Sequence, residues 1–180
     1  AANVDQALLV VTLAVPKTSF GFIDRFLATA EAYSIPAHLI FNKQDIFEDD
    51  DLLKEGLMKA MDLYKKIGYK CYSVCSTDMK KEKKEEMISL LKDKITLLSG
   101  HSGVGKSTFI NAIEPSLDLK VGNLSTAHKK GTHTTTFTEM HPLSFAGIHP
   151  ACSDKSWNKI GSSYIIDTPG IKEFSVINMD

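Results

Sequence analysis

The sequence predicts an α/β fold with a mostly parallel sheet and helices on both of its faces. Three observations lead to this prediction. Short apolar runs alternate along the chain with segments of helical periodicity. The 180 residues suit one domain with a sizeable core. Hydrophobic residues make up 43% of the chain and charged residues 24%, as in ordinary globular proteins. We therefore expect one domain spanning residues 1–180.

Six apolar or alternating segments are expected to form the strands. Each is bounded by polar residues, Gly or Pro, and strands joined through a helix pair in parallel. The segments cover residues 6–15, 37–41, 69–74, 95–98, 134–145 and 164–166. Residues 116–133 and 147–163 are expected to be loops.

Four segments with apolar residues three and four positions apart are expected to form helices. They cover residues 22–30, 52–64, 80–94 and 109–113. Acidic residues at 49–51 favour a helix start, and Gly68 and Pro115 mark helix ends. The apolar residues assigned to the second helix are Leu52, Leu53, Leu57, Met61 and Tyr64.

Charge and cysteine content exclude several classes of protein. The 21 basic and 22 acidic residues give a net charge of −1, which argues against a DNA partner. A local basic contact at residues 129–130 stays possible, whereas the mixed charges of residues 80–86 suit a solvated helix face. No apolar run approaches the roughly 20 residues of a membrane span. The 3 cysteines are expected to be free thiols in a reducing cytoplasm.

Residues 100–107 match the phosphate-loop pattern G-x-x-x-x-G-K-S and lie between an expected strand and an expected helix. Glycines let the backbone curl so that its N–H groups point at phosphate oxygens, and the helix N-terminus adds its dipole. Lys106 is expected to reach the β- and γ-phosphates, and the Ser107 hydroxyl to bind Mg²⁺. The residues expected to contact the nucleotide here are Gly100, His101, Ser102, Gly103, Val104, Gly105, Lys106, Ser107 and Thr108.

The base is expected to be read by an N-K-x-D motif formed by Asn42, Lys43 and Asp45 at the end of a strand. The Asp45 carboxylate can accept hydrogen bonds from N1–H and the 2-amino group of guanine. Adenine offers neither donor, so ATP would leave the carboxylate unpaired. The Lys43 stem can cover the base, and the Asn42 amide can tie this motif to the phosphate loop. Guanine nucleotides are therefore the expected ligands.

A D-x-x-G motif follows the last expected strand. Asp167 can hold Mg²⁺ through water, and the Gly170 N–H can sense a γ-phosphate. The hydroxyl-rich segment 131–136 could supply the remaining Mg²⁺ ligand, for which we name Thr135. The same segment also suits the polar entry to a β-branched strand.

The order of the motifs is rotated. Conventional guanine-nucleotide domains run from phosphate loop through threonine loop and D-x-x-G to N-K-x-D and a base-contacting loop. Here these elements begin at residues 100, 131, 167 and 42, with the base-contacting loop near 75. Read as a circle, the order is unchanged, so a circular permutation of a three-layer phosphate-loop NTPase fold is expected.

In this permuted order, the motifs at residues 100–108, 131–136 and 167–174 resemble those of the RsgA (YjeQ) family of circularly permuted GTPases. The resemblance implies GTP/GDP and Mg²⁺ as ligands and a cytoplasmic, monomeric GTPase. It implies assistance in late assembly of the small ribosomal subunit, contact with rRNA and faster hydrolysis on that subunit. The family's oligonucleotide-binding barrel and zinc-binding domain are not present in the sequence. The chain is thus expected to be an excised GTPase domain, with zinc only in that other domain.

Two departures from the expected pattern bear on mechanism. The base-contacting loop contains Cys75 and Ser76 where the family is usually rich in Ser and Ala. Ile171 follows D-x-x-G, where Ras-like enzymes have the glutamine that orients water. Intrinsic hydrolysis is therefore expected to be slow, with His133 or a ribosomal surface ordering the water.

Other functions stay open from the sequence. One is a nucleotide-dependent binding module with negligible turnover. The others are a permuted GTPase that acts on the large ribosomal subunit and a phosphate-loop ATPase. Nucleotide preference and phosphate release, measured with and without small subunits, separate them.

Overall fold

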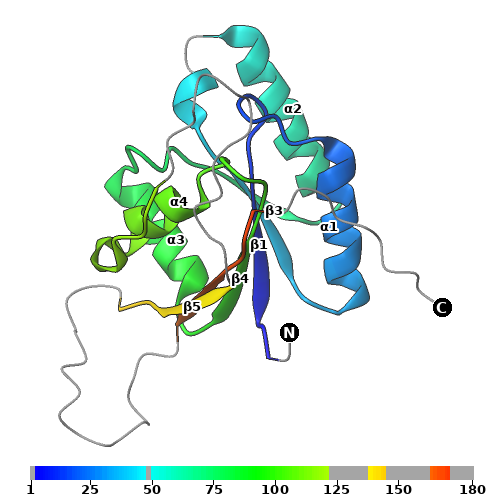
Figure 1. The fold of residues 1–180 in the computed structure, drawn as a ribbon. Helices are drawn as coiled ribbons and strands as arrows, with labels where there is room; N and C mark the ends of the chain where they lie inside the picture. The colour runs from blue at the N-terminus through cyan, green and yellow to red at the C-terminus, as the bar shows by residue number, and fades with distance from the viewer. Residues whose placement is uncertain (1–2, 48–49, 122–137, 145–162, 171–180) are drawn as a thin grey trace, which may run out of the picture.

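The computed structural model describes residues 3–47, 50–121, 138–144 and 163–170. A six-stranded sheet with the order β3-β2-β1-β4-β6-β5 forms its centre (Figure 1). The neighbouring strands are parallel except for β5, which runs antiparallel to β6. The strands are β1 (Gln6–Val11), β2 (Ala37–Phe41), β3 (Lys70–Ser73), β4 (Ile95–Ser99), β5 (Glu139–Pro142) and β6 (Tyr164–Asp167).

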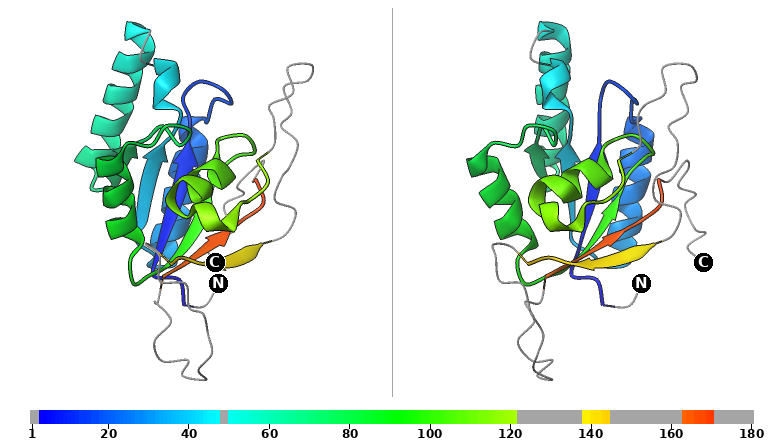
Figure 2. Two further views of the ribbon diagram at one scale, coloured as in Figure 1. Left: turned by 90° about the vertical axis from the view of Figure 1, so that its left-hand side faces the viewer. Right: turned by 60° about the vertical axis from the view of Figure 1, so that its left-hand side comes forward.

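Helices cover both faces of this sheet. Figures 1 and 2 show α3 and α4 on one side and α1 and α2 on the other. The α-helices are α1 (Phe20–Ala32), α2 (Asp51–Lys66), α3 (Lys81–Leu91) and α4 (Lys106–Ile113), and the short 3₁₀ helices are η1 (Gln44–Phe47) and η2 (Pro115–Leu117). The predicted α/β class and three-layer arrangement are confirmed.

The core divides into two clusters because successive side chains of a strand point to opposite faces. On β1, Leu9 and Val11 pack in the cluster under α1 and α2. Leu8 and Val10 pack in the other cluster, which also contains Phe109 of α4. All six residues of β1 are buried, which explains why the five from Ala7 to Val11 are apolar.

The predicted strand over residues 6–15 is too long, because β1 ends at Val11. The Thr18 N–H donates to the Thr12 carbonyl at 2.8 Å and closes a loop at this point. Leu13 and Ala14 nevertheless pack against the core from that loop. Apolar composition therefore predicted neither the end of the strand nor the 58% exposure of Val15.

Other boundaries also differ from the prediction. Leu52 is 80% exposed, so it does not belong to the buried side of α2. Asp50 caps this helix by accepting hydrogen bonds from the N–H groups of Leu52 and Leu53. The helix expected at 80–94 ends at Leu91. Within the described part of the expected strand 134–145, β5 covers only Glu139–Pro142.

None of the helices in the described ranges is long and apolar enough to cross a bilayer.

Candidate nucleotide-binding site

Five parallel strands end at one edge of the sheet, and the predicted motifs lie in the loops that follow them. The N-K-x-D residues follow β2, the base-contacting loop follows β3, the phosphate loop follows β4, and D-x-x-G begins at the end of β6. Ligands of open α/β sheets bind at this edge. The rotated chain therefore brings its separated motifs to one place.

The phosphate loop leads directly into α4. Lys106 is the first residue of that helix, and no side chain caps its N-terminus. The first N–H groups of such a helix have no partner within the helix, so they can bind an anion. Gly105 has a φ of 96°, a left-handed conformation that disfavours other residues.

The Lys106 side chain lies within this loop. Its Nζ donates to the carbonyl oxygens of Gly100 at 3.0 Å and His101 at 3.3 Å. Burial lowers the pKa of the Lys106 ammonium, and the nearby Asp167 carboxylate opposes that shift. Bound phosphates would offer this desolvated cation a stronger partner than the two carbonyl groups.

Asn42 joins the base motif to two other loops. Its Nδ2 donates to the Val104 carbonyl of the phosphate loop at 2.8 Å. Its Oδ1 accepts hydrogen bonds from Ser76, at 3.1 Å from the backbone N–H and 2.8 Å from the hydroxyl. Asn42 is 2% exposed. A Cβ at Gly105 would collide with the Asn42 amide, so glycine is required for this contact.

Asp45 and Lys43, which were predicted to contact the base, each have a partner within the protein. The Cys75 thiol donates to Asp45 Oδ1 at 3.2 Å. Lys43 Nζ donates to the Val15 carbonyl at 2.6 Å, which stretches the side chain toward the loop after β1. Burial lowers the pKa of Lys43, whereas Asp45 raises it. The charged ends of the two N-K-x-D residues are thus held by separate loops.

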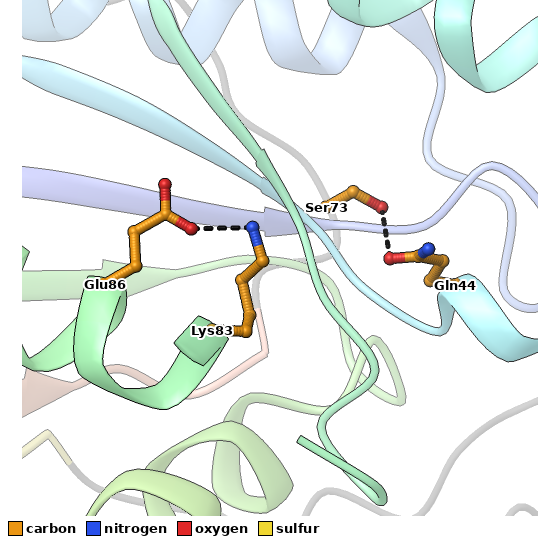
Figure 3. Close-up of polar contacts among 4 residues, drawn as sticks. All are labelled: Gln44, Ser73, Lys83 and Glu86. Atoms are coloured by element: carbon orange, nitrogen blue, oxygen red, sulfur yellow. Dashed lines mark hydrogen bonds and ion pairs between the residues drawn. The ribbon is translucent and has the colours of Figure 1, made fainter. Parts of the chain in front are cut away.

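Gln44 fixes the backbone of the same motif. Figure 3 shows the Ser73 hydroxyl of β3 donating to Gln44 Oε1, at 3.0 Å. The Gln44 N–H also donates to the Val74 carbonyl at 3.1 Å. These contacts attach the base motif to the neighbouring strand.

Figure 3 also shows an ion pair on α3 between Lys83 and Glu86, with 2.6 Å between Nζ and Oε2. A second pair joins Lys81 and Glu85 at 3.9 Å. Both pairs lie within one helix and are exposed. They agree with a solvated helix face at residues 80–86.

The D-x-x-G segment packs against the phosphate loop. The Thr168 hydroxyl donates to the Leu98 carbonyl of β4 at 2.9 Å. A Cβ at Gly170 would lie 2.7 Å from the Ser102 nitrogen, closer than real Cβ contacts allow. Gly170 thus permits the contact between the two segments.

The His101 side chain lies against α1. Its ring centroid is 3.9 Å from that of Phe22, and the rings are inclined at 55°. Burial and the positive charge of Lys106 both lower its pKa. Only the backbone of His101 therefore remains suitable for contacting a phosphate.

A magnesium ion fits the chemistry of the described donors. Ser107 and Asp167 are both buried and supply hydroxyl and carboxylate oxygens, the ligand type that Mg²⁺ prefers. No group of three or more His, Cys, Asp or Glu residues that could hold a metal occurs in the described ranges. A nucleotide-linked Mg²⁺ takes most of its ligands from phosphates and water. His133, Thr135 and Ile171 lie outside the described residues.

Several contacts were not foreseen from the sequence. Two of them are the Lys43 bond to Val15 and the packing of Gly170 on Ser102. No local sequence pattern predicts either contact. The Val15 carbonyl is a backbone group, which can accept a hydrogen bond from any donor. Gly170 has no side chain, so it adds nothing to a pattern of polar and apolar residues.

The phosphate loop, the base motif and D-x-x-G are thus assembled at one edge of a permuted sheet. A model of the RsgA GTPase family matches residues 1–177. The chain belongs to the RsgA GTPase family. It is 48% identical over 180 residues to the small ribosomal subunit biogenesis GTPase RsgA of Phocaeicola vulgatus, and 46% identical to that of Bacteroides fragilis. The match covers 100% of this chain and 52% of each relative, so the chain spans about half their length.

Two solved structures have a similar fold. YjeQ from Thermotoga maritima superposes with a TM-score of 0.66 and 32% identity, over 93% of this chain and 48% of that chain. YloQ, described as a circularly permuted GTPase, has a TM-score of 0.62 and 29% identity, over 96% and 47%. The predicted family and fold are confirmed.

Proposed function

We propose that this chain binds guanine nucleotides and hydrolyses GTP to GDP and phosphate, as the GTPase domain of an RsgA-type protein. The observation that carries the proposal is the position of Asn42. One buried amide contacts both the phosphate loop and the base-contacting loop. A bound nucleotide would lie across this bridge, with its base at Asp45 and its phosphates at Lys106.

The geometry favours a particular residue for each of the chemical roles. Lys106 would neutralise the β- and γ-phosphates, and the N–H groups at the start of α4 would hold their oxygens. Ser107 and Asp167 would hold Mg²⁺, directly and through water, and this ion would neutralise charge that develops during phosphoryl transfer. The Gly170 N–H would contact the γ-phosphate.

The attacking water needs a partner because Ile171 can neither donate nor accept a proton. His133 and a surface of the ribosomal subunit are the two proposed partners, and Thr135 is the proposed further Mg²⁺ ligand. These proposals rest on sequence alone.

We further propose that the small ribosomal subunit and its rRNA are the partners, in the cytoplasm. The support is the name of the relatives, small ribosomal subunit biogenesis GTPase. The monomeric state remains a proposal from sequence.

Base specificity can be tested at Asp45 with fluorescent nucleotides. We expect GDP and GTP to bind and ATP not to compete. Asp45→Asn should weaken guanine binding by about 10- to 100-fold because a charge-assisted pair of hydrogen bonds is lost. The same change should improve binding of xanthine nucleotides, whose 2-oxo group matches an amide donor. Asp62→Asn on the exposed side of α2 is the control, and equal affinity for ATP and GTP would refute the proposal.

Turnover is tested separately by phosphate release. We expect slow release from the chain alone. The full-length protein should release phosphate faster with small subunits than with large ones. Tight GTP binding without turnover under either condition would indicate a binding module instead.

A further inference from the structure

The loop that follows β1 is a closed turn held by its own threonines. It comprises residues 12–18, and we call it the β1–α1 loop. The Thr18 N–H donates to the Thr12 carbonyl at 2.8 Å, and the Thr12 N–H donates to Thr18 Oγ1 at 3.3 Å. Thr12 Oγ1 accepts a further bond from the Ala14 N–H at 3.2 Å. Both threonines are buried, so water competes little for the bonds that fix this loop.

The β1–α1 loop lies beside the base motif. Val11, the residue before it, accepts a hydrogen bond from the Asn42 N–H at 2.8 Å. Figures 1 and 2 show the blue loop next to the cyan η1, which begins directly after Lys43. The Val15 carbonyl of the loop accepts from Lys43 Nζ at 2.6 Å. The loop therefore presents a backbone acceptor to the base motif.

The Lys43 backbone has a conformation that other contacts must stabilise. Its φ is 63°, in the left-handed region that is unfavourable for residues with a side chain. On one side of Lys43, the Asn42 N–H bonds to β1, and on the other the Gln44 N–H bonds to the Val74 carbonyl. The residue is thus held on both sides of its backbone and at the end of its side chain. Unfavourable backbone conformations of this kind are concentrated at ligand-binding sites.

A tethered ammonium suits the nucleoside half of the proposed ligand. An ammonium carries three donors, so the bond to Val15 leaves two for a ligand. A lysine side chain that is already ordered loses less conformational entropy when a ligand contacts it. We propose that the β1–α1 loop orders the Lys43 side chain for contact with the nucleoside, and that Thr18 is a positioning residue that acts through Lys43. This inference rests on the proposed function and adds a positioning element to that site.

The loop should affect the binding of GDP and of pyrophosphate differently, because pyrophosphate has no nucleoside. In the whole chain, Thr18→Val keeps the side-chain volume and removes the acceptor for the Thr12 N–H. We expect this change to weaken GDP binding by about 3- to 10-fold, the cost of ordering one long side chain. Pyrophosphate binding should stay unchanged in calorimetric titration. Thr18→Ser keeps the hydroxyl and should restore the GDP affinity.

Two further variants separate positioning from a general loss of structure. Thr29→Val is the matched control, because the Thr29 hydroxyl also bonds a backbone group, the Arg25 carbonyl of α1 at 2.8 Å. It should leave both affinities unchanged. Lys43→Met removes the ammonium, so adding Thr18→Val to it should cause no further loss of GDP affinity.

Three results would overturn the proposal. Thr18→Val could bind GDP as the native chain does, or it could lose GDP and pyrophosphate affinity equally. The third result is an additive loss in the double variant, since the loop would then act without Lys43. Should Thr18→Val unfold the chain, Thr12→Val replaces it, because that change removes the acceptor for the Ala14 N–H. A native chain that binds pyrophosphate but no GDP would instead refute the proposed function.

Discussion

Asn42 shows how one side chain can organise a site. Its amide donates once and accepts twice, and all three partners belong to loops distant in sequence. In a buried position, a lost partner costs about 1–3 kcal/mol, because water cannot replace it. The side chain therefore contributes to folding and, in the proposed nucleotide site, would align the base and phosphate contacts.

Replacing this amide should affect stability and binding together. We expect Asn42→Ala to lower the free energy of unfolding by about 1–3 kcal/mol and to weaken GDP binding, because the loops lose their common partner. Urea unfolding and fluorescence titration measure the two effects. Asn111 offers a matched control, because its side chain also makes two hydrogen bonds, to the Leu119 backbone at 2.8 Å each. Asn111→Ala should lower stability but leave GDP affinity unchanged; equal loss of affinity in both variants would contradict the assignment.

His38 should make the stability of the fold depend on pH. Burial, followed by the charges of Lys70 and Lys94, lowers its pKa from 6.5 to about 4. The unfolded chain therefore binds a proton more readily than the folded chain between these values. The stabilising contribution is present above pH 6.5 and is lost as the pH falls toward 4.

The expected loss between pH 7 and pH 5 is about 1–2 kcal/mol of unfolding free energy. His38→Phe should reduce this loss, because the aromatic contact with Tyr72 can persist without a titrating group. Urea unfolding at several pH values provides the measurement. An unchanged pH profile in the variant would show that other groups are responsible.

At the level of loops and helices, replacing two different glycines by alanine should have opposite effects. One substitution disturbs a loop contact, and the other stabilises a helix. We expect Gly170→Ala to displace the D-x-x-G segment from Ser102 and to slow GTP hydrolysis more than it weakens GDP binding. Gly56 lies in α2 with nothing near its hypothetical Cβ. Gly56→Ala should raise the free energy of unfolding by about 0.5–1 kcal/mol and leave nucleotide kinetics unchanged. Single-turnover hydrolysis and urea unfolding compare the pair, and normal turnover in Gly170→Ala would contradict the expected role.

The strands and helices were predictable where periodicity and burial agree. The run 37–41 forms β2 as predicted, and the phosphate loop leads into a helix. The error over residues 12–15 has a physical cause, since Thr12 and Thr18 close a hydrogen-bonded loop that apolar composition does not report. Contacts such as Lys43 with Val15 depend on how distant segments meet, so they became visible only in the structure. Positions 133 and 135 lie outside the described residues, and their roles stay predictions.

At the scale of the whole molecule, a ligand that joins both groups of loops should stabilise the fold. A ligand that binds only the folded state adds about 2.7 kcal/mol at 100 times its dissociation constant. We expect GDP to raise the unfolding temperature and ADP to leave it unchanged. Calorimetry or a dye-based thermal scan with matched nucleotide concentrations measures this shift. Equal shifts with GDP and ADP would show that only the phosphates are recognised.

The position of β4 has a consequence for synthesis of the chain. During translation, β1, β2 and β3 emerge before β4, and β1 keeps an unpaired edge until β4 arrives to occupy it. Asn42 likewise has no Val104 carbonyl to bind until the ribosome has added more than 60 further residues, since 62 positions separate the two. The nascent polypeptide therefore carries the proposed base-reading residues before the proposed phosphate loop has been synthesised. Under the proposed function, nucleotide binding is then restricted to chains in which β4 has joined the sheet.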